Sequence, residues 1–262
     1  MIAGMLLVVD VGNTQTHFGT FRDGELVEHW RFATERTSTS DELGAAFASL
    51  LELRGLAFDD LTASIVSTVV PELEPEYEGM VAQYLGHRAL LVGPGLKTGM
   101  PIQIDNPREL GADRLVNAIA GYERFHEACV VVDFGTAVTF DAISADGEYL
   151  GGVIGPGVAI SMEALASRAA KLPPIELGEP LGEPGGVIGK TTHASLQSGI
   201  VYGFAGAVDA IARRVQRELG DDTQFVATGG HAAAIVPFCE MIDEVDDLLT
   251  LTGLRLIWES NS

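Results

Sequence analysis

The sequence has few cysteines and no long hydrophobic run, and each absence excludes a class of protein. Only Cys129 and Cys239 occur among 262 residues, too few for a disulfide scaffold, and we interpret both as buried thiols of a reducing cytoplasm. No apolar run reaches the roughly 18–20 residues that a membrane span needs. The apolar stretch from Ile2 to Val11 has no basic leader and no cleavage site, so it predicts a buried strand rather than a signal peptide. These features predict a cytoplasmic protein.

Positive charge is also scarce. The chain has 16 Lys and Arg against 37 Asp and Glu, which gives a net charge of −21. Such a surface repels the phosphates of nucleic acids and of anionic lipids, so we expect neither nucleic acid nor a membrane as a partner. ATP is not excluded, because it arrives with Mg²⁺ and meets local hydrogen-bond donors.

Several common catalytic motifs are missing. None of the six histidines pairs at metal-ligand spacing, and there is no G-x-S-x-G motif of a serine hydrolase. Gly189-Lys190-Thr191 resembles the end of a P-loop, but Pro184 stands where that loop requires its first glycine. The chain is therefore not a P-loop kinase.

An internal repeat divides the chain. Two stretches share one pattern: VVDVGNTQTHFGTFRDGELV at residues 8–27 and VVDFGTAVTFDAISADGEYL at residues 131–150. At a constant offset, Asp10 matches Asp133 and Gly12 matches Gly135. A chain of this length, with 47% hydrophobic residues, is long enough for two domains of about 130 residues, each with its own hydrophobic core. We expect an N-terminal lobe over 1–117, with a first phosphate loop and a substrate motif, and a C-terminal lobe over 118–262, with a second phosphate loop and a Gly-Gly turn.

Each copy of the repeat predicts three strands: an apolar strand, a tight glycine turn, a returning strand, and an Asp-Gly turn into the third. Helical patterns follow. A capping box of Thr39 and Glu42 predicts a helix that ends near Gly55, and further helices are expected near 72–85 and over 192–219. Strands mixed with helices in a duplicated order predict an α/β fold of two similar lobes with a nucleotide cleft between them.

The two Asp-x-Gly turns are the best candidates for chemistry. Glycine permits the backbone conformations and the close approach that a phosphate chain demands. Asp10 and Asp133 can hold hard cations, and Asn13, Thr14 and Thr136 add donors. Phosphoryl transfer needs this combination of cations and donors. One such turn is common in ordinary hairpins, but the duplicated pair predicts a phosphate site.

A third motif, Gly111-Ala112-Asp113-Arg114, begins a helical pattern after an Asn106-Pro107 turn. Asp is favoured at helix starts, so simple capping explains Asp113. Alternatively, Asp113 is a general base for a substrate hydroxyl and Arg114 is a fork for a substrate carboxylate. The sequence leaves both interpretations open.

Glycine recurs at three further places. Residues 151–157 are expected to lie between a strand and a helix, and Thr228-Gly229-Gly230 follows a strand, where the backbone can lie against a flat ligand such as adenosine. In the helix expected over 192–219, Gly199, Gly203 and Ala207 form a ridge of small residues. The ridge fits equally a helix approaching across a dimer and ordinary packing within the chain.

Together these residues resemble the type III pantothenate kinases of the acetate and sugar kinase/Hsp70/actin superfamily, which has ribonuclease H-like lobes. The matching motifs follow the family order along the chain: Asp10-Val11-Gly12-Asn13-Thr14, Lys97-Thr98-Gly99, Asn106-Pro107, Gly111-Ala112-Asp113-Arg114, Asp133-Phe134-Gly135-Thr136, Gly151-Gly152, Thr192 and Thr228-Gly229-Gly230. The resemblance implies transfer of the ATP γ-phosphoryl group to the primary hydroxyl of pantothenate, giving 4′-phosphopantothenate in the first step of coenzyme A biosynthesis. It also implies Mg²⁺ with ATP, a monovalent cation (K⁺ or NH₄⁺) and a homodimer.

The resemblance further implies roles for single residues. The first nucleotide-phosphate loop would comprise Asp10, Val11, Gly12, Asn13, Thr14, Gln15, Thr16 and His17, and Thr136 would also contact ATP. Asp113 would be the general base, and pantothenate would be held by Gly111, Ala112, Asp113, Arg114 and Thr192, with Arg114 near its carboxylate. Asp133 would bind the monovalent cation, and Asp10 is the other metal candidate.

One position departs from the family pattern. Two residues before Asn106-Pro107, many members carry a Tyr that lines the pantothenate pocket, and this chain has Ile104. Ile104 keeps an apolar wall but loses a polar contact. Two other functions stay open: a kinase or phosphohydrolase of the same superfamily that acts on a sugar or polyphosphate, and a non-catalytic nucleotide-sensing module. The presence of Asp10, Asp113 and Asp133 argues against the second.

Overall fold

The computed structural model describes residues 4–93, 95–169, 172–174, 176–177 and 186–262. Contacts divide the chain into two compact units: unit 1 with residues 1–99, 106–120 and 249–262, and unit 2 with residues 100–105 and 121–248. The change of unit after residue 120 lies close to the predicted boundary after residue 117. The C-terminal helix belongs to unit 1, and the segment 100–105 belongs to unit 2. One boundary between an N-terminal and a C-terminal domain cannot describe this division, so the two predicted domains stay a prediction.

Unit 1 contains a five-stranded mixed sheet in the order β3-β2-β1-β4-β5. Its strands are β1 (Met5–Val11), β2 (Gln15–Arg22), β3 (Glu25–Ala33), β4 (Leu61–Thr68) and β5 (Leu90–Leu91). β1, β2 and β3 pair antiparallel, and β4 pairs parallel with β1. Asp23 and Gly24 both have positive φ, 51° and 84°, which is the conformation that a tight hairpin turn requires. The predicted three-strand pattern of the first copy is confirmed.

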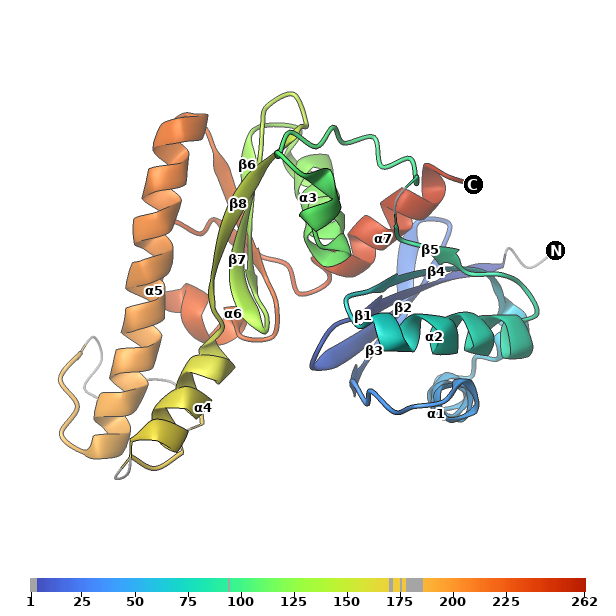
Figure 1. Ribbon diagram of the computed structural model, residues 1–262, viewed down its shortest axis with the longest axis horizontal. Helices are drawn as coiled ribbons and strands as arrows, with labels where there is room; N and C mark the ends of the chain where they lie inside the picture. Colours follow the sequence, from blue (N-terminus) through green and yellow to red (C-terminus); the bar gives the residue numbers. More distant parts are fainter. Residues whose placement is uncertain (1–3, 94, 170–171, 175, 178–185) are drawn as a thin grey trace. The chain divides into compact units, whose positions relative to one another are not determined.

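The helices of unit 1 follow the predicted signals. They are α1 (Ser40–Glu52), a 3₁₀ turn (Pro71–Leu73) that leads into α2 (Glu74–Met80) and a π-helical turn (Val81–Leu85), and α7 (Leu249–Glu259), together with the first part of α3 (Ala112–Phe125). The Thr39–Glu42 capping box is present in full. α1 and α2 pack on one face of the sheet, and α7 packs on β1, β2 and β4 (Figure 1).

Unit 2 repeats the same sheet. Its strands are β6 (Cys129–Phe134), β7 (Ala137–Ile143), β8 (Tyr149–Pro156), β9 (Gln224–Thr228) and β10 (Glu244–Val245), in the order β10-β9-β6-β7-β8. The pairing matches unit 1, with β7 antiparallel and β9 parallel to β6. The repeat in the sequence is thus a repeat of structure, and the α/β fold of two similar lobes is confirmed.

One expectation in unit 2 is wrong. The glycine-rich residues 151–157 do not connect a strand to a helix, because residues 149–156 form β8 itself. Among the named strands of the described ranges β8 pairs with β7, with Gly151 opposite Ala142 and Pro156 opposite Ala137. On its other side β8 has an isolated bridge between its first residue, Tyr149, and Ile102. An edge strand tolerates glycine and proline, since only one of its sides takes part in the ladder of hydrogen bonds.

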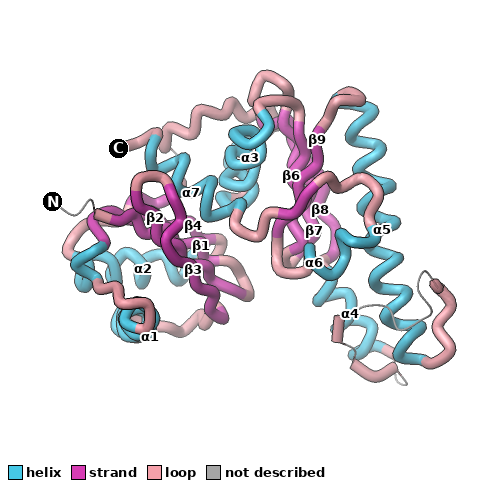
Figure 2. Tube along the Cα trace, turned by 180° about the vertical axis from the view of Figure 1, so that it is seen from behind, coloured by secondary structure: helices cyan, strands magenta, loops and turns pink. Residues whose placement is uncertain are grey.

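The helices of unit 2 are α4 (Val158–Arg168), α5 (Thr192–Leu219) and α6 (Ala232–Ile235), followed by a 3₁₀ turn (Val236–Phe238). The bounds of α5 are those predicted. Figure 2 shows α5 running along the sheet of unit 2, where its apolar face packs on β6, β7 and β9. Within the described ranges, none of the helices combines the length and the apolar character that crossing a membrane requires.

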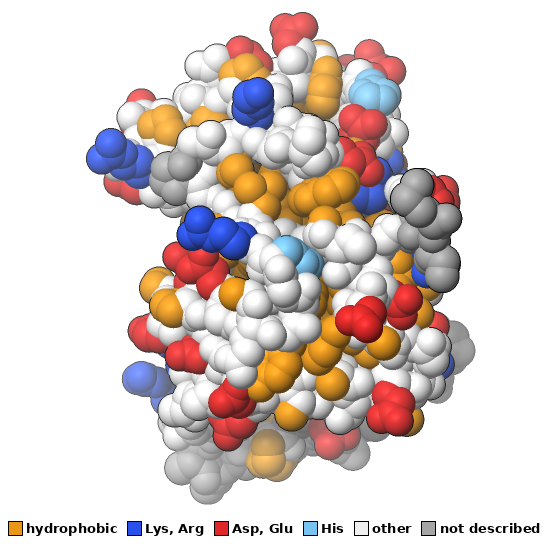
Figure 3. All heavy atoms as spheres, turned by 90° about the vertical axis from the view of Figure 1, so that its right-hand side faces the viewer, with side chains coloured by type: hydrophobic (Ala, Val, Ile, Leu, Met, Phe, Trp, Pro, Cys, Tyr) orange, Lys and Arg blue, Asp and Glu red, His pale blue; other side chains and the backbone are white. Residues whose placement is uncertain are grey.

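The alternation of side chains fixes where the polar residues point. In β1, Met5, Leu7 and Val9 face the helical core of unit 1, and in β6, Val130 and Val132 face the core of unit 2. Because side chains alternate along a strand, Asp10 and Asp133 lie on the opposite face of each sheet. Acidic side chains are spread widely over the face shown in Figure 3, as the net charge of −21 leads one to expect.

Candidate active site

The first phosphate loop is a tight turn between β1 and β2. Gly12 N donates to the carbonyl oxygen of Gln15 at 3.1 Å. A Cβ atom at Gly12 would lie 2.8 Å from the same oxygen, so only glycine fits there. The side chains of Asn13, Thr14 and Gln15 are exposed, whereas Val11 and Thr16 are buried. The residues at 13–15 are therefore the ones whose side chains a ligand can reach.

His17 lies opposite both Asp10 and Arg31 in neighbouring strands. Burial, with additional repulsion from Arg31 and His29, lowers the pKa of His17 from 6.5 to about 4. His17 is therefore neutral at pH 7. It can donate or accept a hydrogen bond, but it brings no positive charge to the loop.

The substrate motif lies at the start of α3. Asn106 begins a 3₁₀ turn (Pro107–Glu109), where its side chain accepts a hydrogen bond from Arg108 N. Gly111, Ala112, Asp113 and Arg114 then lead into the helix, so these four predicted substrate residues are brought together. A Cβ atom at Gly111 would lie 2.5 Å from Asp113 Oδ1, and the glycine is what allows the carboxylate to take this position.

Asp113 is a largely buried carboxylate that a backbone hydrogen bond holds in place. Arg114 N donates to Asp113 Oδ1 at 2.8 Å, which fixes the carboxylate. Burial nevertheless raises the pKa of Asp113, and the hydrogen bond and charge of Arg114 oppose the rise only in part. A carboxylate with a raised pKa is a stronger base than an exposed one and is still ionised when its pKa stays below the working pH. Asp113 thus lies at the start of a helix, as a capping residue would, but it also has a raised pKa, which capping does not require.

The second phosphate loop joins β6 to β7 and is enclosed by two glycines. A Cβ atom at Gly229 would lie 2.3 Å from Asp133 Oδ1 and 2.7 Å from Phe134 N. A Cβ atom at Gly157 would lie 2.0 Å from the Thr136 carbonyl oxygen. Gly229 also has a φ of +95°, a conformation that favours glycine. The turn that follows β9 and the start of α4 therefore both approach the backbone of this loop.

His231 supports the same loop. Its backbone N donates to the Phe134 carbonyl at 3.3 Å, and its Nδ1 lies 3.4 Å from the same oxygen. Since a carbonyl only accepts, Nδ1 carries the proton. The Gly-Gly turn thus contacts the second phosphate loop, while its predicted contact with adenosine stays a prediction.

Ile104 belongs to a segment that is attached to the edge of the second sheet. Gln103 N donates to the Tyr149 carbonyl, and Tyr149 N donates to the Pro101 carbonyl, both at 2.8 Å. A Cβ atom at Gly151 would lie 3.6 Å from Ile104 Cγ2, so Ile104 packs beside β8. Tyr149 is itself anchored, because its hydroxyl donates to the buried Asp141 at 2.7 Å.

Thr192 is the first residue of α5 and is exposed. The preceding Thr191 caps the helix, since its side chain accepts a hydrogen bond from Ala194 N at 3.1 Å. The Thr192 side chain is therefore not needed for capping.

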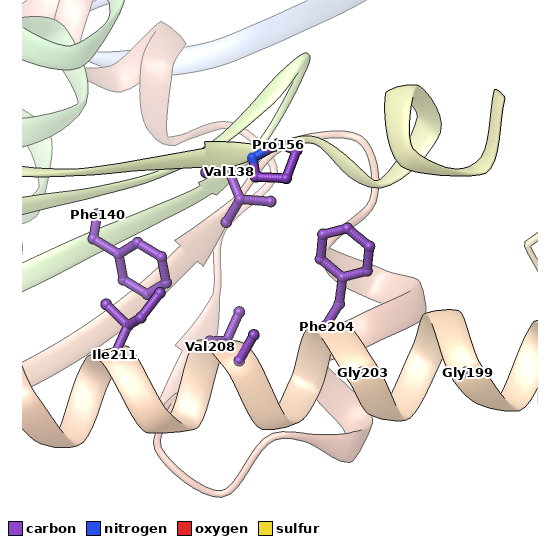
Figure 4. A pocket seen from close by; sticks show the side chains of 10 residues that line it. Val138, Phe140, Pro156, Gly199, Gly203, Phe204, Val208 and Ile211 are labelled. Carbon is purple, nitrogen blue, oxygen red and sulfur yellow. The ribbon is translucent and has the colours of Figure 1, made fainter. Parts of the chain in front are cut away.

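The small-residue ridge of α5 lines an apolar groove in unit 2 (Figure 4). The groove has a volume of about 300 Å³ and is lined by Val138, Phe140, Gly155 and Pro156 of the sheet and by Gly199, Gly203, Phe204, Ala207, Val208 and Ile211 of α5. A Cβ atom at Gly199 or Gly203 would meet nothing within 4 Å. Packing within the described part of the chain therefore does not explain these two glycines.

No group of three or more His, Cys, Asp or Glu side chains that could hold a metal occurs among the residues described. Asp10 in unit 1 and Asp133 in unit 2 each offer one carboxylate at the end of a strand. A single carboxylate of this kind is enough for Mg²⁺, which typically takes one or two protein carboxylates and finds its other ligands in substrate phosphates and water.

Sequence reasoning missed three kinds of support for these loops. Gly157 was counted with a glycine-rich stretch, but its close approach to Thr136 was not foreseen. Thr34 N donates to the Thr14 carbonyl and Arg36 Nη2 donates to Asn13 Oδ1, although neither residue belongs to a motif. The sequence signal that could have identified Thr34 and Arg36 is their position just after β3. β3 pairs with β2, and β2 begins directly after the first phosphate loop.

Three comparisons with known proteins bear on this site. The sequence profile described as type III pantothenate kinase matches residues 6–214. A type III pantothenate kinase from Myxococcus xanthus is 51% identical over 257 residues, which cover 98% of this chain and 99% of the relative. One from Moorella thermoacetica is 49% identical over 258 residues, covering 98% and 100%. Among solved structures, the activator of the 2-hydroxyisocaproyl-CoA dehydratase from Clostridium difficile has a TM-score of 0.55 at 13% identity, covering 98% and 96%, a likeness of fold alone.

Proposed function

The chain belongs to the type III pantothenate kinase family, and from that premise we propose which of its residues carry out the reaction. The protein is an ATP-dependent kinase that phosphorylates pantothenate in coenzyme A biosynthesis. The observation that carries the assignment of roles is Asp113, a carboxylate that is fixed by a backbone hydrogen bond and has a pKa raised by burial.

Asp113 is the general base. One of its oxygens accepts from Arg114 N, and the carboxylate takes the proton from the primary hydroxyl of pantothenate as that oxygen attacks the γ-phosphorus of ATP. Arg114 binds the carboxylate of pantothenate, and Gly111, Ala112, Thr192 and Ile104 complete the substrate contacts. The bond from the γ-phosphorus to the bridging oxygen of ADP breaks, and ADP leaves with that oxygen.

The two phosphate loops hold ATP. In the first loop the backbone of residues 10–17 and the side chains at positions 13–15 contact the phosphates, and in the second loop Thr136 contacts ATP. Asp10 is suited to Mg²⁺ and Asp133 to a monovalent cation, which together neutralise the phosphate charge. Positioning supplies much of the acceleration, because holding two reactants in the right geometry is worth roughly 7–11 kcal/mol.

The reaction is tested by ADP release from the purified protein with MgATP and K⁺, with and without pantothenate. We expect release that depends on pantothenate and that falls when Na⁺ replaces K⁺. Release without any acceptor would instead indicate an ATPase. No stimulation by pantothenate, from a protein that still binds ATP, would point to another acceptor and make Ile104 the first position to examine.

The kinase acts as a homodimer in the cytoplasm. Support for the dimer comes from the apolar groove of α5 and from the edge strand β8, where Val153 and Ile154 are exposed at 36% and 64%. A groove of this kind beside an exposed apolar edge is typical of an interaction surface. Support for the cytoplasm comes from Cys129 and Cys239, which are both free thiols.

The dimer is tested with one substitution in the groove. Gly203 lines the groove and has open space beside it, so Gly203→Arg leaves the monomer intact but inserts charge into the proposed interface. We expect it to shift the protein from dimer to monomer in light scattering coupled to gel filtration. The matched control is Gly206→Arg, since Gly206 also lies in α5 with open space but is not among the groove residues. A dimer that survives Gly203→Arg, or that both variants abolish equally, would contradict this interface.

A further inference from the structure

A chain of hydroxyl groups supports the first phosphate loop, and its direction can be assigned. Thr34 Oγ1 donates to the Gly12 carbonyl at 2.8 Å. Its only proton is thereby used, so Thr34 Oγ1 must accept from Thr16 Oγ1, 2.9 Å away. Thr16 in turn accepts from the Tyr77 hydroxyl at 3.4 Å. Thr16 and Tyr77 are buried, and Thr34 N donates to the Thr14 carbonyl at 2.9 Å. Thr34 therefore anchors the loop backbone to the core of unit 1.

Arg36 follows Thr34 by two residues and contacts a side chain of the loop. Arg36 Nη2 lies 3.0 Å from Asn13 Oδ1. A guanidinium group can only donate, so the amide atom that faces Arg36 must be the carbonyl oxygen, and Asn13 Nδ2 must point away from Arg36. Within the described ranges Asn13 Nδ2 donates to no protein atom, and no carboxylate forms an ion pair with Arg36.

These contacts leave two kinds of donor exposed at the loop. The amide of Asn13 offers two N–H groups whose direction is fixed, and the guanidinium of Arg36 keeps donors beyond the one that Asn13 uses. Both side chains are exposed. Phosphate oxygens accept such donors, and a positive charge that no carboxylate neutralises is valuable in a chain with 37 acidic and 16 basic residues.

We propose that Arg36 is a positioning residue for nucleotide binding, which orients the Asn13 amide toward the phosphate chain of ATP and adds positive charge beside it. The proposal rests on the proposed assignment of this loop to ATP. It gives a function to a residue that lies outside every motif of the sequence, and it explains why the connection after β3 is fastened to the loop by Thr34.

The test is the affinity for MgADP and for a non-hydrolysable MgATP analogue, measured by calorimetry without pantothenate. We expect Arg36→Ala to weaken nucleotide affinity by about tenfold and to raise the KM for ATP similarly, with the KM for pantothenate unchanged. Arg36→Lys keeps the positive charge and an ammonium group that can still donate to Asn13 Oδ1, so it should recover most of the affinity. In a double-mutant cycle, adding Arg36→Ala to Asn13→Ala should cost clearly less than it costs alone, because the two side chains act together.

Arg54→Ala is the matched control. Arg54 is also an exposed cation of unit 1, it pairs with Glu28 at 3.5 Å, and its removal changes the net charge equally. An Arg36→Ala affinity within twofold of the wild type, an equal loss in Arg54→Ala, or full additivity with Asn13→Ala would overturn the proposal. Nucleotide affinity is measured without the acceptor, so this test and the test of pantothenate phosphorylation can fail separately. If Arg36→Ala binds nucleotide more weakly and the wild type does not phosphorylate pantothenate, the role of Arg36 is supported and the proposed substrate is contradicted. If Arg36→Ala binds nucleotide normally and the wild type does phosphorylate pantothenate, the role of Arg36 is contradicted and the substrate is supported.

Discussion

Replacing Asp113 with Asn is expected to lower kcat by about 10²–10⁴-fold, the usual contribution of a general base. The change keeps the shape of the side chain and an oxygen that can accept from Arg114 N, as Asp113 Oδ1 does at 2.8 Å. What is lost is the negative charge and, with it, the capacity to take a proton. Nucleotide affinity should stay within twofold of the wild type, measured by the same calorimetry. A parallel loss of nucleotide binding in a folded variant would contradict the role of Asp113.

We expect Asp113→Asn to leave the stability of the fold unchanged or to increase it. Burial raises the pKa of Asp113 in the folded protein, so the folded state holds this proton more tightly than the unfolded state does. Ionising Asp113 therefore costs stability. The cost appears as pH rises from the ordinary pKa of a carboxyl group through the raised value, and it stays constant above that value. Asp113→Asn avoids this cost, so its Tm at pH 7.5 should equal or exceed that of the wild type. A marked fall in Tm would show that the charge is structural.

The pH dependence of catalysis follows from the same shift. Asp113 accepts a proton only when it is ionised, so kcat/KM for pantothenate, which reports the groups of the free enzyme, should fall on the acid side as pH drops through the raised pKa. The midpoint is expected above that of an ordinary carboxyl group. His17 has its pKa lowered to about 4, so it is neutral near pH 7 and adds no inflection there. A profile that is flat down to the pH of an ordinary carboxyl group would argue that Asp113 is not the base.

Local signals in the sequence predicted the elements that depend on local interactions. The Thr39–Glu42 capping box is formed because both of its hydrogen bonds lie within one helical turn. The bounds of α5 at Thr192 and Leu219 were predicted from its apolar period and are those observed. The repeat indicated two equivalent sheets, because each copy carries its own strands and turns. The cluster at Gly111 to Arg114 was identified for the same reason, since its residues are consecutive.

Features that depend on distant residues were not predictable in this way. A third strand was predicted after the Asp146-Gly147 turn, but its extension over residues 151–156 was missed, because these glycines resemble a loop and only pairing with β7 makes them a strand. α7 belongs to unit 1 although it is last in the chain, which a repeat with one boundary does not indicate. Tyr77 supports the first phosphate loop through Thr16, 61 residues earlier. A side chain that acts through a tertiary contact leaves no pattern in the residues beside it.

Gly157→Ala is expected to disable the second phosphate loop. The new Cβ atom would lie 2.0 Å from the Thr136 carbonyl oxygen and 2.8 Å from that of Gly135, although a carbon and an oxygen need roughly 3.3 Å. Both atoms belong to the backbone, so no side chain can rotate away, and either α4 or the loop must move by about 1 Å or more. Misplacement on that scale can cost about 10²-fold in rate. We expect kcat/KM for ATP to fall by that factor and the free energy of unfolding to fall by about 1–3 kcal/mol.

Gly155→Ala is the control, because it makes the same chemical change two residues earlier, within β8, whereas Gly157 directly precedes α4. The nearest atom to a Cβ at Gly155 is the Val138 carbonyl oxygen, at 3.8 Å, an ordinary contact. Gly155→Ala should therefore keep the Tm of the wild type and a kcat/KM within twofold of it. Steady-state kinetics and thermal denaturation of the two variants separate the close approach of Gly157 from a general need for glycine in β8. Equal losses in both variants would mean that the edge strand, rather than the contact with Thr136, requires glycine.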